Sequence, residues 1–312
     1  MEIEVIRYNE SHKSSWDSFV KESKNNLFFF QRDYMDYHSD RFLDHSLIFK
    51  NKNQIIAVFP ANEREKEIFS HGGLTYGSLI VNKRVKSVEV LEVFSALKKY
   101  YSSNGFQKLI YKAIPYIFSE QPFQEDLYAL FINKAHLFRR DISSVISIKN
   151  RLPLAKSPAK KFKDCSALNL EIVENKDFDK YWELLTNILT RHNATPTHSL
   201  EEIHRLAKKF PDNIKLFEIH ENGALICGSV IFDFGNVVHT QYLANSERGR
   251  TIGALDYLII KLIEEQFQNK EYFSFGISTE NQGLHLNEGL INQKEMYGGR
   301  AVCNDFYEIS ML

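Results

Sequence analysis

The stretch TQYLANSERGRTIGALDYLIIKLIEEQ, residues 240–266, carries the pattern that decides the fold. It continues an alternating, strand-like run that starts at His239. The turn Arg248–Ala254 follows, with two glycines and two arginines. An amphipathic helix comes next, and its apolar residues recur at helical spacing: Leu255, Leu258, Ile259, Leu262 and Ile263. Because Tyr272–Ile277 is again apolar, we predict a strand, a turn, a helix and a returning strand.

The same order of elements occurs earlier in the chain. The two tryptophans, Trp16 and Trp182, are 166 residues apart, and each opens a helical pattern. The returning strands begin at Phe106 and Tyr272, again 166 residues apart. The hairpins and the strands that follow them also match: Leu47–Phe59 with Ile214–Cys227, and His71–Val81 with Val237–Leu243. An internal duplication is therefore predicted.

Two domains follow from this repeat, residues 1–150 and 151–312. Each is expected to be an α/β (α+β) unit, in which helices flank a mixed, mostly antiparallel sheet. A length of 312 residues suits two such domains. The connection Arg151–Lys163 has two prolines and five basic residues. We interpret it as a solvent-exposed connection between the halves. The alternative is that its basic residues bind a phosphate.

Composition narrows the functional classes. The net charge is −1, so no overall field attracts DNA. The N-terminal MEIEVIRYNE is no signal peptide, and no apolar run is long enough to span a membrane. Three separated cysteines without a C-x-x-C pair indicate buried thiols in a reducing, cytoplasmic compartment.

This double arrangement resembles the GNAT acyltransferase superfamily, in particular its tandem FemABX-like (peptidoglycan aminoacyltransferase-like) branch. By element order the resemblance covers nearly the whole chain, and it is sharpest from Phe217 to Asp305. Residues 240–266 and 272–301 are similar to GNAT proteins of polysaccharide and cell-envelope biosynthesis. The resemblance implies an N-acyltransferase with an acyl-CoA donor and no metal.

The GNAT pattern Gln/Arg-x-x-Gly-x-Gly/Ala is matched by Arg248 and Gly253, whereas Thr251 stands in place of the first glycine. In the family this turn holds the donor pyrophosphate, because a helix N-terminus offers free amides and glycines permit close approach. The alternative is a turn that only needs small residues. The equivalent slot Asn82–Ser87 is basic but lacks glycine, so we place the donor in the second half. The implied donor-binding residues are Gln241, Tyr242, Leu243, Arg248, Gly249, Arg250, Thr251, Gly253, Ala254 and Asn281.

Acyl transfer needs a base and an acid near the donor carbonyl, which in the GNAT plan lies beside His239–Leu243. His239 is the candidate base, and a structural histidine is the alternative. Glu280 follows the last central strand, where α/β sheets often present functional groups, although it could equally belong to a turn or a helix cap. Tyr297 is the candidate acid.

The acceptor is expected at the loop between two helices of the second half, which covers the acceptor pocket in GNAT folds. Ser199 and Glu202 form a capping box, leaving Arg191, His192 and His198 in the loop. The histidine spacing does not support a metal site. His71 and Tyr76 in the first half could line a cleft between the halves, or belong to a bulged strand.

Three functions remain open at this point. The first is transfer of an acyl group from acyl-CoA to an amine or hydroxyl of a sugar, sugar nucleotide or cell-envelope precursor. The second is an aminoacyl-tRNA-dependent FemABX-type transferase, which the near-neutral charge disfavours. The third is a non-catalytic binding module that kept the fold.

Overall fold

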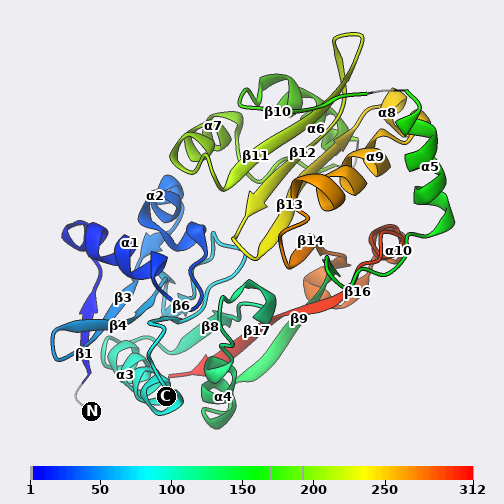
Figure 1. The fold of residues 1–312 in the computed structure, drawn as a ribbon. Helices are drawn as coiled ribbons and strands as arrows, with labels where there is room; N and C mark the ends of the chain where they lie inside the picture. Colours follow the sequence, from blue (N-terminus) through cyan, green and yellow to red (C-terminus); the bar gives the residue numbers. More distant parts are fainter. Residues whose placement is uncertain (1–2, 169, 192, 312) are drawn as a thin grey trace. The chain divides into compact units, whose positions relative to one another are not determined.

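The computed structural model describes residues 3–168, 170–191 and 193–311, which form two compact units (Figure 1). Unit 1 holds the residues up to Asp141, Gln282–Leu284 and those from Cys303 onward. Unit 2 holds Ile142–Asn281 and His285–Val302. The C-terminal residues, expected in the second domain, thus belong to the first unit. Among the described residues, no helix is both long and apolar enough to cross a membrane.

The sheet of unit 2 is ordered β10-β11-β12-β13-β14-β9. All neighbouring strands are antiparallel except β13 and β14, which run parallel. The strands are β10 (Ile172–Asn175), β11 (Ile214–Glu221), β12 (Ala224–Asp233), β13 (Val237–Asn245), β14 (Tyr272–Ile277) and the end of β9 (His136–Ser147). A separate two-stranded ribbon pairs β15 (Thr279–Glu280) with β16 (His285–Leu286).

Helices cover both faces of this sheet. Cys227 on β12 belongs to the core formed with α9, whereas a Cβ at its neighbour Gly228 would lie 2.8 Å from the Tyr181 ring of α6. Since successive strand residues point to opposite faces, α6 and α9 lie on opposite sides. The helices are α5 (Lys156–Ser166), α6 (Asp179–Thr190), α7 (Leu200–Lys209), α8 (Glu247–Ile252), α9 (Ala254–Lys261) with its π-helical end η5 (Leu262–Gln266), and α10 (Glu288–Glu295).

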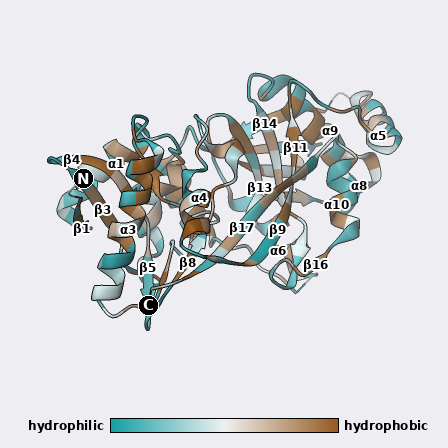
Figure 2. Cartoon of the chain, turned by 90° about the horizontal axis from the view of Figure 1, so that it is seen from below, coloured by the Kyte–Doolittle hydropathy of each residue, from teal (hydrophilic) through white to brown (hydrophobic). Residues whose placement is uncertain are grey.

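Unit 1 contains two groups of strands. One sheet is ordered β1-β3-β4-β7, all antiparallel, and the other strands follow the order β17-β8-β6-β5-β2, in which β6 and β8 are parallel. The strands are β1 (Glu4–Arg7), β2 (Leu43–Asp44), β3 (Leu47–Asn51), β4 (Gln54–Phe59), β5 (Asn62–Arg64), β6 (Glu67–Phe69), β7 (Ile80–Val81), β8 (Lys108–Lys112) and the end of β17 (Arg300–Ser310). The helices are α1 (Lys13–Lys21), α2 (Arg32–Met35), α3 (Ser87–Ser103) and α4 (Glu125–Ile132). In each unit, apolar residues gather along the strands (Figure 2).

The predicted duplication is visible in both units. Trp16 on α1 and Trp182 on α6 are both buried, and the two predicted hairpins are β3–β4 and β11–β12. Each hairpin turns through two residues with positive φ, Lys52-Asn53 and Asn222-Gly223, as tight hairpins require. The expected α/β class, with mixed sheets flanked by helices, is therefore confirmed.

Two details differ from the sequence prediction. Of the predicted strand His71–Val81, only Ile80 and Val81 form a strand, and Gly77 adds an isolated bridge to Lys112, because the glycine-rich loop packs tightly. A Cβ at Gly77 would overlap the Ser70 carbonyl, so this loop follows the neighbouring backbone rather than pairing as a strand. Cys165 and Cys227 are buried as expected, whereas Cys303 is exposed.

Each unit is completed by a strand from the other half of the sequence. Residues Val145–Ser147 of β9 (green in Figure 1) pair with β14 in unit 2. Residues Phe306–Ser310 of β17 (red) pair with β8 in unit 1. A cut of the chain at residue 150 would therefore remove one strand from each sheet.

This exchange predicts how fragments fold. A fragment of residues 142–302 keeps the β9 partner of β14, and we expect it to melt cooperatively. A fragment of residues 151–302 leaves β14 as a bare edge and uncovers the core around Ile146, so we expect no cooperative melting transition. Calorimetry and near-ultraviolet circular dichroism compare the two; equal cooperativity would contradict the role assigned to β9.

Candidate functional site

The central feature of unit 2 is a seam between β13 and β14. Their parallel pairing covers Val237, Val238 and His239, which face Tyr272, Phe273 and Ser274. Beyond Ser274 no further backbone pairing joins these strands in the described chain, although β13 continues to Asn245 and β14 to Ile277. We call the facing edges of residues 240–245 and 275–277 the seam. Backbone groups that point into it have no partner on the neighbouring strand.

Bulges lie on both sides of the seam. Gln241 is the extra residue of a bulge in β13, between Thr240 and Tyr242. In β14 the register with β9 shifts between Ser274 and Ile277, and Gly276 there has a φ of +73°. A Cβ on Gly276 would lie 3.0 Å from His239 Cε1, so glycine is needed for both its backbone angle and its contact. Bulges bend a strand away from its neighbour, which explains why the seam opens here.

His239 lies at the closed end of the seam. Its Nδ1 is 3.1 Å from Ser274 Oγ, and the side chain is partly buried. Burial, with a smaller contribution from the charge of Lys294, lowers the pKa of His239 to about 4. The ring is therefore neutral at pH 7 and can accept a hydrogen bond or a proton, with less basicity than an ordinary imidazole.

Lys294 is a site residue that the sequence analysis missed. It projects from α10, is 7% exposed, and its Nζ donates to Gly276 O at 3.0 Å and Ile277 O at 2.6 Å. Burial lowers its pKa to about 8. The ammonium thereby fixes the end of β14 at the seam. No local signal marks it, because lysines on such helices usually face solvent.

Two predicted groups meet at Tyr242, within the seam residues of β13. The Tyr242 hydroxyl lies 2.7 Å from His198 Nδ1 and accepts the His198 backbone N–H at 3.2 Å. Trp182 contacts the Tyr242 ring edge-on at 5.2 Å, and burial raises the pKa of Tyr242. The structure thus brings the expected acceptor loop against the expected donor strand. Leu243, by contrast, packs into the core of unit 2.

The turn after β13 is more occupied than expected. Ser246 Oγ accepts the Gly249 amide at 3.0 Å, and Arg248 forms a two-bond ion pair with Glu221 at 2.6 and 2.7 Å. Thr251 Oγ1 donates to Glu247 O at 2.9 Å. The remaining predicted residues are Arg250, which is exposed with Nε donating to Asn245 O at 3.3 Å, Gly253, which ends α8, and Ala254, which begins α9 in the core.

Gly249 serves packing. A Cβ there would lie 2.5 Å from Ile226 O and would also overlap Asn245. The turn can therefore approach β12 only with glycine at this position, which is the purely structural reason for part of the motif. Arg250 is left as the cation of this turn without an ion pair in the described chain.

The catalytic candidates Glu280 and Tyr297 each have a local hydrogen-bond partner, whereas the donor-binding candidate Asn281 lies on a turn. Glu280 is exposed and accepts from Asn287 Nδ2 at 2.8 Å, and Asn281 has a positive φ on an exposed turn. The Tyr297 hydroxyl donates to Asp256 at 2.9 Å, and its ring stacks on Phe275. Burial, followed by the charge of Asp256, raises the pKa of Tyr297, which makes it a weaker acid than a free tyrosine.

The remaining predicted acceptor residues are dispersed. Arg191 is exposed and lies 3.3 Å from Glu247, while His192 lies outside the described residues. His71 and Tyr76 belong to unit 1 and are buried there. The His71 ring stacks on His38 at 5.2 Å, and burial lowers its pKa well below the usual value.

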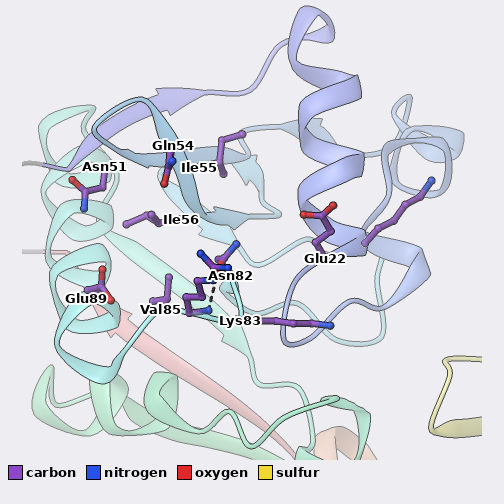
Figure 3. Close-up of a pocket in the computed structure, with 11 residues that line it drawn as sticks. Glu22, Asn51, Gln54, Ile55, Ile56, Asn82, Lys83, Val85 and Glu89 are labelled. Carbon is purple, nitrogen blue, oxygen red and sulfur yellow. Dashed lines mark hydrogen bonds between the residues drawn. The ribbon is translucent and has the colours of Figure 1, made fainter.

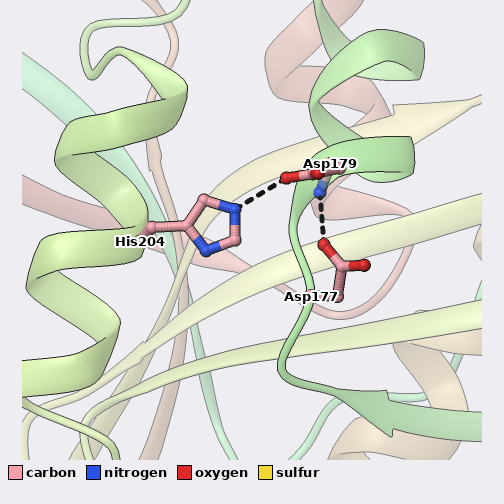
Figure 4. A group of neighbouring side chains, drawn as sticks. All are labelled: Asp177, Asp179 and His204. Carbon is pink, nitrogen blue, oxygen red and sulfur yellow. Dashed lines mark hydrogen bonds and ion pairs between the residues drawn. The ribbon is translucent and has the colours of Figure 1, made fainter.

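Asp177, Asp179 and His204 form another polar group on unit 2 (Figure 4). His204 Nε2 lies 2.8 Å from Asp179 Oδ1, and Asp177 Oδ1 accepts the Asp179 backbone N–H at 3.0 Å. All three side chains are at least partly exposed. Because Asp177 accepts a free amide at the start of α6 and Asp179 contacts His204, the group stabilises the helix start, and we assign it no metal.

The fold, with its two units, is similar to that of FemX and of tandem GNAT proteins. It is similar to FemX (TM-score 0.69, 10% identity, 97% of this chain and 96% of FemX). It is also similar to L-PGS from Bacillus licheniformis, with a TM-score of 0.63 and 12% identity over 95% of this chain and 91% of L-PGS. A tandem GNAT protein from the clavulanic acid biosynthesis pathway is similar too, with a TM-score of 0.53 and 10% identity over 100% of this chain and 99% of that protein. No family model matches the sequence, and no curated protein matches it. The expected resemblance is thus confirmed at the level of the fold.

The packing role of Gly249 gives one prediction. Gly249→Ala should lower the free energy of unfolding by about 1–3 kcal/mol, because the new methyl group overlaps backbone that cannot move freely. Gly289→Ala is the matched control, since its Cβ would meet nothing closer than Asn287 Oδ1 at 3.7 Å. Urea denaturation measures both; equal stabilities would contradict the close approach of the turn to β12.

Lys294 gives a pH prediction. Its pKa is about 8 when folded and 10.5 when unfolded, so the folded state binds fewer protons between these values. The contribution of Lys294 to the free energy of unfolding therefore rises with pH across this interval, by up to about 3 kcal/mol. Lys294→Met should lose this rise, whereas the exposed control Lys180→Met should keep it. Denaturation at pH 7, 8, 9 and 10 tests this, and parallel curves for both variants would contradict the burial of the ammonium.

Proposed function

We propose that this protein is an acyltransferase that holds its donor along the seam of unit 2. The acyl group passes from acyl-CoA to an amine or hydroxyl of a sugar, sugar nucleotide or cell-envelope precursor. The observation that carries the proposal is the opening of β13 from β14 in the middle of a sheet. The extended arm of acyl-CoA that carries the thioester can pair with the backbone groups there, as an added strand would.

The transfer itself is a substitution at the thioester carbonyl. The acceptor nitrogen bonds to the carbonyl carbon, the C–S bond breaks, and one proton moves from nitrogen to the leaving sulfur. Unpaired amides of the seam can donate to the carbonyl oxygen as negative charge develops on it. In this proposal neutral His239 accepts the acceptor's proton, and Lys294 keeps the end of β14 in place.

Two groups near the seam suit the two substrates. Arg250 offers an exposed cation to the phosphates of the donor, whereas Arg248 is already paired with Glu221. His198 and Tyr242, held together at 2.7 Å, offer a rigid polar contact to the acceptor. Glu280 and Tyr297 have structural partners, Asn281 lies on an exposed turn, and none of the three receives a role in this proposal.

An aminoacyl-tRNA donor is the second candidate. The folds of FemX and L-PGS favour it by analogy, and α5 carries the exposed lysines 156, 160 and 163 on one helical face. Such a row suits a phosphate backbone. The net charge of −1 gives no further attraction.

A binding screen with turnover separates these candidates. Acetyl-CoA, longer acyl-CoAs and aminoacyl-tRNA are tested for thermal stabilisation, and bound donors are then tested for transfer to amino-sugar acceptors. Acyl-CoA binding with turnover supports the first candidate, and salt-dependent binding of charged tRNA supports the second. Binding without turnover points to a binding module, and the absence of any binding rejects the proposal.

Arg250→Ala should weaken acetyl-CoA binding about tenfold, because one charge-assisted contact to phosphate is lost. Its melting temperature should stay unchanged, since the side chain is exposed. Arg205→Ala on α7 is the control, as it removes an equally exposed arginine of unit 2. Calorimetric titration measures both; equal affinities for the two variants would place the donor phosphates elsewhere.

A further inference from the structure

Unit 1 contains a pocket of about 570 Å³ that the proposed transfer does not use (Figure 3). Four segments bound it: the end of α1, the β3–β4 hairpin, the turn Asn82–Val85 and the start of α3. Its volume lies in the usual range for small-molecule sites. Ile55, Ile56 and Val85 give it an apolar floor.

The position of the pocket follows from the duplication. The turn Asn82–Val85 joins β7 to α3, as the turn after Asn245 joins β13 to α8. In unit 2 that turn is filled by the Ser246 cap and the Arg248–Glu221 ion pair. In unit 1 the corresponding turn borders an open pocket.

The floor of the pocket is held rigidly. Val85 N donates to Asn82 O at 3.0 Å, Arg84 N to Asn82 Oδ1 at 2.9 Å, and Asn82 N to Ile56 O at 3.0 Å. Lys24 is buried, and its Nζ donates to Val85 O at 2.9 Å. A turn fixed from three sides presents its side chains in one arrangement, which favours binding by lowering the entropy lost.

The lining carries unpaired charges of both signs. Lys83 is paired with Glu120 at 2.6 Å, and Glu89 Oε2 accepts the Lys86 amide at 2.9 Å. Lys21, Arg84 and Glu22, in contrast, have no ion pair within the described chain. Two free cations suit an anionic group, and one free carboxylate suits hydroxyl or amino groups beside it.

We propose that this pocket binds the phosphate ester of a small, hydroxyl-rich molecule, either a sugar phosphate or a nucleotide. Arg84 and Lys21 hold the phosphate, and Glu22 with the side-chain amide of Gln54 binds the hydroxyl or amino groups. Because both signs are present, the ester binds more tightly than inorganic phosphate alone. The site is separate from the seam and does not depend on the proposed transfer.

The test uses the full chain carrying Arg250→Ala, which removes the proposed phosphate contact of unit 2. Inorganic phosphate, glucosamine 6-phosphate and ADP are titrated by calorimetry. At least one ester should bind about tenfold more tightly than inorganic phosphate. Lys21→Gln/Arg84→Gln should weaken that ester about tenfold or more, while Lys66→Gln/Lys99→Gln, which removes two exposed lysines of the same unit, should not.

Glu22→Gln should reduce the preference for the ester over inorganic phosphate without abolishing phosphate binding. Preference for glucosamine 6-phosphate identifies a sugar phosphate, and preference for ADP a nucleotide. No measurable binding of either ester, equal affinity for ester and inorganic phosphate, or equal weakening by the two double variants would each overturn the proposal.

Discussion

The structure depends on one interrupted hydrogen-bond ladder. β13 and β14 pair through His239 and Ser274 and then separate, although both continue inside the sheet of unit 2. Open backbone in a sheet interior is costly unless water or a ligand satisfies it. Here the separation is built in, by a bulge at Gln241, by Gly276 with its positive φ, and by the Lys294 ammonium bound to the end of β14.

The duplicated plan explains how such a seam is tolerated. The strand next to β14 is the end of β9, which comes from the first half of the sequence, and the end of β17 closes the sheet of unit 1 in return. Because β14 pairs with β9 up to Ser274 and again at Ile277, it can leave β13 without becoming a loose edge. Buried residues on both helical faces of the sheet, such as Tyr181 and Leu258, hold β12 and β13 in place.

The sequence predicted the parts that follow from periodicity. Both hairpins, both tryptophan-bearing helices and the strand–turn–helix around Arg248 follow from spacing alone. Contacts between distant residues could not be read in this way. The Arg248–Glu221 ion pair, the burial of Lys294 and the Tyr242–His198 contact all join separate elements. The loop Gly72–Ser78 resembled a strand only because its apolar residues alternate, while its glycines allow close packing instead.

Hydrogen exchange of the seam amides tests the central claim most directly. In the free protein, those amides of residues 240–245 that do not pair with β12 should exchange much faster than the amides of β12. Acetyl-CoA, or aminoacyl-tRNA if that is the donor, should slow their exchange and that of residues 275–277. Slow exchange in the free protein, equal to that of β12, would show that β13 and β14 pair along their whole length and that no seam exists.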